Sequence, residues 1–364
     1  MKLRIIPTLT LIILLIGITT FSSCDIDTTK SSTETISTDI TSATTWESDK
    51  TYIIEKDNLY ISDVLTIEPG TTIKIMSGGN IIIKSKGNIV ANGTSAKPIV
   101  FTSVKDDNHG DDTNKDGDNT IPAAGDWGYI NLNGSQNSSF ENCLFLYGGR
   151  DNANPATVDV SSEATATFNN CTFAYNSGNL LNNIYVGALN ASNASKDTKI
   201  SNCKFYGNKV PVTINAEMSI DNSNSFSNEG TANKCNGIFV SGSNVSSDIS
   251  WLEDEVAFVV TAPILQIDRS QTLTLGDNVV IKFTEHSSLT VMSGEGCLIN
   301  HDGPGVFFTS IKDDEHKGDT NGDGDETSPD TADWTGIYLD NWKSTNGYAN
   351  WNNILYNDPL ATAK

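Results

Sequence analysis

From Trp46 onward, short apolar segments alternate with glycine-rich or polar turns. Within the segments, apolar residues recur at every second position, as at Ile73 and Ile75 or at Ile81 and Ile83. This period is typical of β-strands that bury one face. The turns follow too closely for helical crossovers and are close even for a β-sandwich, which remains the alternative. The pattern therefore favours an all-β chain folded as a right-handed parallel β-helix, with about three strands in each coil.

A short motif recurs in the middle of the chain as FENCLF, FNNCTF and ISNCKF, which begin at Phe140, Phe168 and Ile200. Asparagine tolerates the left-handed backbone of a sharp turn, so we expect the motif asparagines at one corner of successive coils. Stacked coils would place these side chains in a ladder in which each amide bonds the next. The ladder residues are Asn142, Asn170, Asn202 and Asn222.

Alternation after this corner divides the side chains between the interior and solvent. The expected inward residues are Cys143, Phe145, Tyr147, Cys171, Phe173 and Tyr175. The expected outward residues are Leu144, Leu146, Thr172, Ala174, Lys204 and Tyr206, which form an almost uncharged strip. Cysteines stacked in a column have parallel Cβ vectors, so we expect free thiols instead of disulfides.

A longer duplication frames these repeats. Residues 101–127 align without gaps on residues 308–334, and FTSVKDDNHG matches FTSIKDDEHK. Trp46 and Trp251 open the two copies. We therefore expect a single solenoid with an internal duplication, made of unit one (46–250) and an incomplete unit two (251–364).

The N-terminus has the features of an export signal. Two basic residues precede an apolar run that is short for a membrane span. Small residues then lead to Cys24, as in a bacterial lipobox, so residues 1–23 are interpreted as a lipoprotein signal peptide and Cys24 as the lipidation site. An ordinary cleaved signal is the alternative. Residues 24–45 are rich in Ser and Thr and are expected to form a flexible tether.

The duplicated block contains two acidic segments with the spacing of a calcium-binding loop, DTNKDGD and DTNGDGD. Oxygen-bearing side chains occupy positions one, three, five and seven, and glycine at position six permits the tight turn. A glutamate at position twelve is missing, so a preceding or a following aspartate would complete the site. The candidate ligands are Asp107, Asp112, Asn114, Asp116, Asp118 and Asp126 in copy one, and Asp314, Asp319, Asn321, Asp323, Asp325 and Asp333 in copy two.

All-oxygen ligands favour calcium over zinc or copper. A solvated acidic loop that binds no ion is the alternative. His109 and His316 recur at equivalent positions, and we expect them to form local hydrogen bonds.

With 45 Asp and Glu against 23 Lys and Arg, the chain carries a net charge of −22. This charge argues against nucleic acid and anionic lipid headgroups as partners. A lyase acting on uronates needs a basic residue and cations that neutralise the substrate, yet beyond the signal only Arg150 and Arg269 are arginines. The paired aspartates Asp106–Asp107 and Asp313–Asp314 lie within the duplicated block, which favours a structural role.

Together, the KPIVFTS segment at Lys97, the acidic loop and Gly125-Asp-Trp127 resemble a group of secreted bacterial right-handed parallel β-helix proteins. This group is frequent among lipoproteins of Bacteroidetes and includes adhesin-like and glycan-binding members. The resemblance indicates the fold and leaves the activity open. With the acidic loops, the lipobox-like sequence and the charge, we expect a calcium-stabilised protein, lipid-anchored at the outer membrane or cell surface or facing the periplasm, that binds glycan or protein without catalysis. A polysaccharide lyase or glycoside hydrolase of this fold, and a purely structural envelope protein, are the alternatives.

Overall fold

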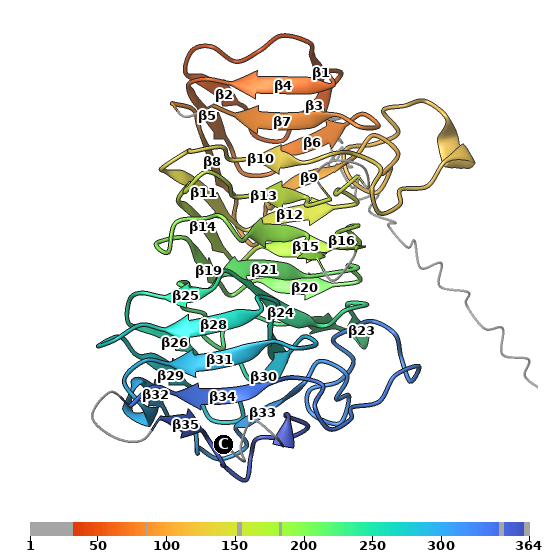
Figure 1. The fold of residues 1–364 in the computed structure, drawn as a ribbon. Helices are drawn as coiled ribbons and strands as arrows, with labels where there is room; N and C mark the ends of the chain where they lie inside the picture. Colours follow the sequence, from red (N-terminus) through yellow and green to blue (C-terminus); the bar gives the residue numbers. More distant parts are fainter. Residues whose placement is uncertain (1–31, 85, 151–154, 182–183, 342–345, 360–364) are drawn as a thin grey trace, which may run out of the picture. The chain divides into compact units, whose positions relative to one another are not determined.

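The structure is a computed structural model, and it describes residues 32–359 except for residues 85, 151–154, 182–183 and 342–345. The described residues belong to one compact unit, with no division near residue 250. Its strands wind in successive coils and pair in parallel with the strands of the neighbouring coils (Figure 1). The chain is thus a right-handed parallel β-helix, as the alternation of apolar residues predicts, and the sandwich alternative is wrong.

Three sheets form the walls of the first coils. Sheet A contains β1 (Thr33–Ile36), β3 (Thr51–Ile54), β6 (Thr72–Ile75), β9 (Ile99–Ser103), β12 (Cys143–Leu146), β15 (Thr172–Ala174) and β20 (Lys204–Tyr206). Sheet C contains β2 (Thr44–Trp46), β5 (Val64–Ile67), β8 (Asn88–Asn92), β11 (Ser138–Glu141), β14 (Ala166–Asn169) and β19 (Lys199–Ser201). Sheet B contains β4 (Asn58–Ile61), β7 (Asn80–Ile83), β10 (Ile130–Asn131), β13 (Val158–Asp159), β18 (Leu189–Ala191), β21 (Val212–Asn215), β24 (Gly237–Ser241), β27 (Ala257–Val260), β30 (Val280–Phe283) and β33 (Phe307–Ser310).

Two further sheets replace sheets A and C in the last coils. A three-stranded sheet contains β26 (Ile249–Trp251), β29 (Leu273–Leu275) and β32 (Leu298–Ile299). A five-stranded sheet contains β25 (Asn244–Val245), β28 (Ile264–Ile267), β31 (Ser288–Val291), β34 (Gly336–Leu339) and β35 (Gly347–Tyr348). The remaining elements are the hairpins β16 (Asn179–Leu181) to β17 (Ile184–Val186) and β22 (Ser227–Asn228) to β23 (Thr231–Ala232), and the 3-10 turns η1 (Gly117–Asn119) and η2 (Glu295–Cys297).

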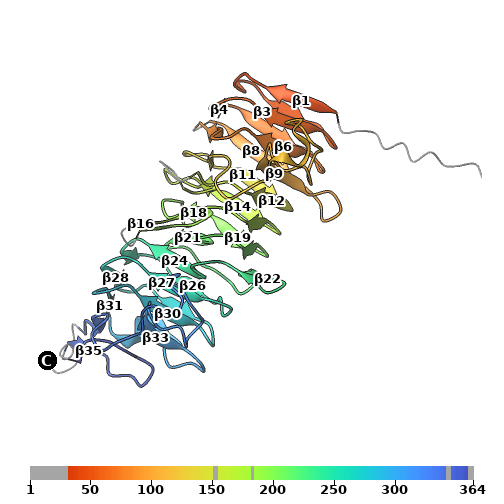
Figure 2. The same ribbon diagram turned by 90° about the vertical axis from the view of Figure 1, so that its right-hand side faces the viewer.

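The duplicated segments do not occupy equivalent walls. Ser225 bridges to Lys204 and extends sheet A by one row, and the β22–β23 hairpin follows directly. Sheet B continues through both copies, as β21, β24, β27 and β30 show in Figure 2, while β25 begins the new five-stranded sheet (Figure 1). As a result, β9 of copy one belongs to sheet A, whereas the equivalent β33 of copy two belongs to sheet B. The sequence duplication therefore places its two acidic loops after different walls.

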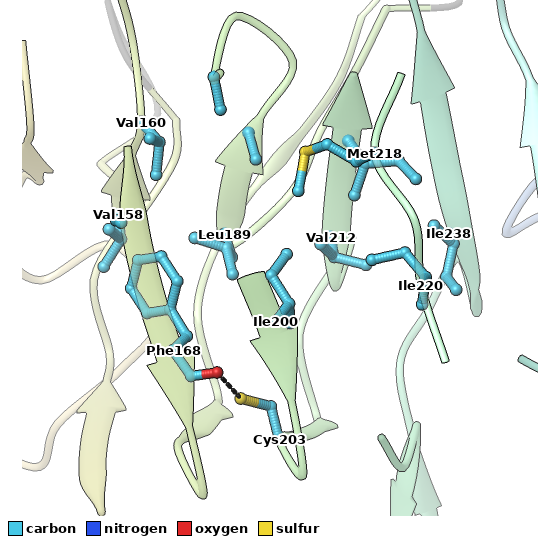
Figure 3. Packing of buried hydrophobic residues seen from close by; sticks show 14 of the residues in the cluster. Val158, Val160, Phe168, Leu189, Ile200, Cys203, Val212, Met218, Ile220 and Ile238 are labelled. Atoms are coloured by element: carbon cyan, nitrogen blue, oxygen red, sulfur yellow. Dashed lines mark hydrogen bonds between the residues drawn. The ribbon is translucent and has the colours of Figure 1, made fainter. Parts of the chain in front are cut away.

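Like residues stack along the core. Phe145 lies between Phe101 and Phe173, with ring centroids 5.1 and 4.7 Å away, and Phe173 stacks on Phe205 at 5.1 Å. Figure 3 shows the aliphatic part of this core, in which the Cys203 thiol donates to the Phe168 carbonyl at 3.6 Å. Burial of these side chains supplies the main favourable term for folding.

The predicted cysteine column is present at Cys143, Cys171 and Cys203, all fully buried and free. The inward prediction is wrong for Tyr147 and Tyr175, because both have a left-handed backbone (φ of 63° and 57°) that ends the alternation. Tyr175 is 42% exposed.

The outward strip also differs from the expectation. Leu146 and Ala174 are buried, and they form a cluster with Val100 against which Tyr147 and Tyr206 pack. Leu144 and Thr172 remain partly exposed and Lys204 exposed. The tyrosines that turn outward at the strand ends therefore cover part of the strip, which is not a continuous open face.

Asn142, Asn170 and Asn202 have the expected left-handed backbone, with φ of 47°, 52° and 53°. However, their side chains do not bond one another. The Asn142 and Asn170 amides donate to Glu141 at 3.1 and 2.9 Å, and Asn202 donates to Asn169 at 2.8 Å. The residues before the corner asparagines therefore provide the acceptors.

The N-terminal prediction is only partly within the described residues. The signal peptide and Cys24 lie outside them. From Thr33 onward the chain differs from the predicted tether, because β1 pairs with β3 and Ile40 bridges to Ile61. Threonine suits an exposed edge strand, so a Ser/Thr-rich segment with Ile36 and Ile40 at its inward positions joins the solenoid.

Candidate metal centre

Each acidic loop leaves the end of a buried strand and returns to the wall beside a buried tryptophan. We define the first acidic loop as residues 104–126, after β9, and the second as residues 311–333, after β33. Trp127 and Trp334 are fully buried, and their indole N–H groups donate to the carbonyls of Leu146 and Leu355, both at 2.7 Å. The two tryptophans thus hold the loop ends in place.

Asp126 and Asp333 close the loops with hydrogen bonds instead of joining the other acidic residues. Asp126 pairs with Lys105 at 2.7 Å and accepts from Ser103 at 3.0 Å. Asp333 pairs with Lys312 at 2.8 Å. Burial raises the pKa of Asp333, but hydrogen bonds, chiefly from Lys312, outweigh this and hold the pKa below its usual value. The structure therefore gives these two predicted ligands a different role, as clamps at the loop exits.

The paired aspartates in each loop separate into two environments. Asp106 is fully buried and accepts from His109 at 2.8 Å and from Thr102 at 2.6 Å. Burial raises its pKa, but these hydrogen bonds lower it further, so the net shift is downward. Asp313 repeats this arrangement with His316 at 2.8 Å. The histidines therefore form the local hydrogen bonds that we expected, and the second aspartate of each pair faces the rest of its loop.

Three carboxylates converge in each loop. In the first loop the group is Asp107, Asp112 and Asp116, and the second loop repeats it with Asp314, Asp319 and Asp323. Within each group, one oxygen from each residue lies within 4.8 Å of the others. Oxygens that share one calcium ion at 2.3–2.6 Å can be about 5 Å apart. These six predicted ligands therefore have the spacing of two cation sites.

Backbone and side-chain donors orient these carboxylates. In the first loop, the Gly117 amide donates to Asp112 at 3.0 Å, and Asp116 Oδ2 accepts from Thr120 at 2.6 Å and from Asn114 at 3.0 Å. The equivalent bonds recur in the second loop. Gly324 donates to Asp319 at 2.8 Å, and Asp323 Oδ2 accepts from Thr327 at 2.5 Å and from Asn321 at 2.9 Å. One oxygen of each central aspartate is therefore fully used.

Two aspartates in each loop have a buried carboxylate oxygen that forms no hydrogen bond with the described residues. Within the described ranges, Oδ1 of Asp107, Asp116, Asp314 and Asp323 is buried and has no hydrogen-bond partner. A buried carboxylate oxygen without a partner costs free energy. The four atoms are two equivalent pairs, one in each copy, and every one of them belongs to a converging group. This arrangement fits oxygens that bind a cation.

The other predicted ligands lie beside the groups without completing them. Asn114 and Asn321 use their amides to hold Asp116 and Asp323, as described above. Asp118 and Asp325 are exposed. Burial and the nearer aspartates raise the pKa of Asp107 and of Asp314. The negative charge of Asp118 adds to the shift of Asp107, and that of Asp325 adds to the shift of Asp314.

Sequence reasoning did not identify the lysine beneath each loop. Lys74 and Lys282 are fully buried on the outer faces of β6 and β30. Lys74 donates to the Asp111 carbonyl, and Lys282 donates to the Gly318 carbonyl at 2.7 Å. Burial lowers the pKa of Lys282 to about 8. The sequence did contain a sign of this contact, because Lys74 and Lys282 occupy equivalent positions in two strands that are otherwise mostly apolar.

A family model described as a pectate-lyase like beta helix domain matches residues 38–159, about a third of the chain. Comparison with curated proteins and with solved structures gave no match. The matched region contains the first acidic loop and begins within the segment expected to be a tether. The match and the parallel sheets agree on the fold, a parallel β-helix.

Proposed function

We propose that this chain is a calcium-stabilised β-helix that binds glycan or protein at the cell surface without catalysis. The observation that supports calcium is the repeated set of buried carboxylate oxygens without partners. Burial and the carboxylates of Asp112 and Asp319 raise the pKa of Asp107 and Asp314, respectively. A divalent cation would relieve this repulsion, and all-oxygen donors suit calcium.

Calcium binding would also explain why the two loops keep the same internal hydrogen bonds. Each loop carries many like charges on a short segment, and such segments repel and lose a definite shape unless they are neutralised. An ion bound only by the folded loop stabilises the fold as its concentration rises above its dissociation constant. Extracellular calcium modules often have dissociation constants of about 10⁻⁴ to 10⁻³ M.

A binding role is favoured over a lyase or hydrolase by what surrounds the acidic groups. A lyase would need a basic residue beside the acidic groups. The two lysines beneath the loops, Lys74 and Lys282, are buried and donate to main-chain carbonyls. A general base must lie within hydrogen-bond reach of the proton that it removes. Arg269 pairs with Asp340 at 3.4 Å. Lys74 and Lys282 are therefore committed to the loops, and one aspartate of each pair, Asp106 or Asp313, is committed to a hydrogen bond with a histidine.

The ligand surface that fits best is the outer face of sheet A after the first acidic loop. There the chain presents Leu144, Tyr175 and Tyr206 beside the exposed Lys204, with less negative charge than the loops. Tyrosines offer apolar surface and a hydroxyl group, which suits a neutral glycan or a protein partner better than a uronate. The strong negative charge of the whole chain disfavours nucleic acid.

Attachment to the outer membrane or cell surface would come from lipid on Cys24, so the membrane contact is the anchor alone. In the described ranges, no helix has the length and apolar content needed to cross a membrane. A single acyl chain binds a membrane only weakly, and stable anchoring needs more than one. The lipobox-like sequence predicts such multiple acylation.

The proposal is tested by thermal unfolding with and without millimolar calcium. Calcium should raise the melting temperature, and Asp116→Ala combined with Asp323→Ala should remove most of this gain. Asp254→Ala, outside both groups but also acidic, is the matched control and should keep the gain. A melting curve that does not change on chelation would contradict the calcium part of the proposal.

The binding part is tested with a glycan array and with an assay for unsaturated uronate products, both in calcium. Capture of neutral glycans without product absorbance would support a binding module. Product formation that disappears on replacing one Lys or Arg would show an enzyme instead. Stability in calcium with neither binding nor turnover would favour the purely structural alternative.

A further inference from the structure

The two acidic loops lie on chemically different surfaces. The first loop rests on the outer face of sheet A, where a Cβ added to Gly110 would lie 2.6 Å from Thr51 Oγ1 and 3.1 Å from Thr72 Cγ2. The second loop rests against sheet B and the residues that lead into it. At Gly322, which is not the counterpart of Gly110, an added Cβ would lie 2.5 Å from Sγ of Cys235, two residues before β24. The first loop therefore lies over threonine side chains at Gly110, and the second loop lies over a buried cysteine at Gly322.

Cys235 belongs to an apolar cluster that the second loop helps to cover. The cluster contains Tyr185, Val210, Cys235, Phe239, Val259 and Ile311, all buried. Ile311 is the first residue of the loop, and the Asn321 carbonyl accepts from the Cys235 thiol at 3.5 Å. The second loop therefore gains hydrophobic stabilisation by packing on this cluster. The threonines beneath the first loop provide less apolar surface, so the first loop gains less.

Hydrogen bonds show the same asymmetry at one pair of equivalent residues. Thr320 is fully buried, donates to the Ile311 carbonyl at 3.1 Å and accepts from Lys282 at 3.2 Å. Its counterpart is Thr113, whose buried Oγ1 has no hydrogen-bond partner among the described residues.

Further contacts attach the second loop to the wall. The Asn236 amide donates to the Asp319 carbonyl at 3.1 Å, and the Lys317 ammonium donates to the Asp254 carbonyl. Asp319 is accordingly half-buried, whereas its counterpart Asp112 is exposed. The carboxylate group of the second loop is thus held by contacts that do not depend on an ion.

We propose that the two sites bind calcium unequally: the second is ordered before the ion arrives and fills first, and the first is ordered mainly by the ion. This inference rests on the proposed function. A site that is already ordered does not lose conformational entropy on binding. Because fixing one further residue is equivalent to about a tenfold change in affinity, we expect the second site to bind at least about tenfold more tightly.

The order of filling is measured by calorimetric titration of the chelator-treated full chain with calcium. The wild type should show two steps. Asp116→Asn should retain the tighter step, and Asp323→Asn should retain the weaker one. Equal affinities, or the reverse order, would overturn the inference and leave the proposed function intact. No calcium binding at all would overturn both.

The cause of the difference is tested without changing any carboxylate. Thr320→Val removes the hydroxyl bonded to Ile311 and Lys282 and should weaken the second site about tenfold, toward the first. Thr320→Ser keeps the hydroxyl and should restore most of the affinity. Thr113→Val is the matched control and should leave the first site within about twofold, because it removes a hydroxyl that has no partner.

Melting curves in chelator show whether each variant is folded before titration. If Thr320→Val is folded and binds calcium at the second site as tightly as the wild type, preordering by this threonine is wrong. Limited proteolysis offers a second readout. In chelator, cleavage should occur in the first loop before the second, and cleavage at equal rates would also contradict the inference.

Discussion

The side-chain amide of Asn176 donates to Oδ1 of Asn208 at 2.9 Å, inside the wall of the solenoid. Asn208 in turn donates to Oδ1 of Asn233 at 2.8 Å. The first two amides also donate to carbonyls of the preceding coils, Asn176 to Phe145 at 2.9 Å and Asn208 to Phe173 at 2.8 Å. All three asparagines are buried. The amide ladder expected at the motif corner is therefore present at the other end of the sheet A strands.

Replacing the central rung should destabilise the fold strongly. Asn208→Ala leaves Asn233 and the Phe173 carbonyl short of a buried donor, and we expect a loss of about 2–4 kcal/mol. The free energy of unfolding from urea titration measures this loss. Asn193→Ala, at an exposed position, is the control and should change it by less than about 0.5 kcal/mol. Similar losses in both variants would contradict a special role for the ladder.

A second prediction concerns the buried carboxyl of Glu253, which follows β26. Its Oε1 accepts from the Glu255 amide at 2.8 Å, whereas Oε2 has no partner in the part of the chain that the structure describes. Burial, with a smaller contribution from the charges of Glu255 and Asp254, raises its pKa from 4.5 to about 7. The folded state thus binds a proton that the unfolded state releases between these values.

The sign follows from this difference. The contribution of Glu253 to stability is fully present below pH 4.5 and is lost as the pH rises through 7. Glu253→Gln removes this dependence, so the variant should be more stable than the wild type at pH 8, by about 1–3 kcal/mol, and similar to it near pH 5. Urea unfolding at both pH values checks this. An equal gain at both would show that the effect is not protonation of Glu253.

Sequence patterns predicted the repeating parts of the structure well. Apolar alternation predicted the strands and the coil, because each coil has to bury the same face on its neighbours. The FENCLF-type motif predicted the register, and Phe145 does pair with Phe173. The repeated acidic loops predicted the three converging carboxylates, because the spacing of Asp112 and Asp116 is set within a short turn.

Features that depend on distant contacts were not predicted. Alignment of the two copies matches β6 with β30, but the β22–β23 hairpin ends sheet A between them and changes the wall to which the later copy belongs. The ion pair of Asp126 with Lys105 was not predicted, because the two residues lie at opposite ends of the loop. The contact of Lys74 with the loop likewise depends on how the loop folds back.

The cysteines should behave as inert core residues. Burial raises the pKa of Cys171 and of Cys203 well above the usual value, and that of Cys235 to about 11. A thiol reagent should therefore react with none of the described cysteines in the native protein and with all of them in denaturant. Reducing agent should leave the melting temperature unchanged. Rapid labelling of the native protein, or a melting temperature that falls on reduction, would contradict this.

Acylation of Cys24 is predicted by the lipobox-like sequence. Mass spectrometry of the native N-terminus should show lipid on Cys24 and no residue before it. Cys24→Ser is the control and should release the chain from the membrane fraction. A soluble native chain cleaved at another position, with an unmodified thiol at Cys24, would refute the anchor.

The first acidic loop lies across three neighbouring strands of sheet A. It leaves β9, accepts from Lys74 on β6, and passes close to β3 at Gly110, where an added Cβ would lie 2.6 Å from Thr51 Oγ1. Neighbouring strands of the sheet are joined by hydrogen bonds that run along the stack, so a force pulling the coils apart would load those bonds together with the stacked side chains of the core. The loop spans the same gaps and would have to be extracted first. If calcium binds this loop as proposed, it would brace the three strands together, so the force needed to separate the first coils should rise with calcium concentration.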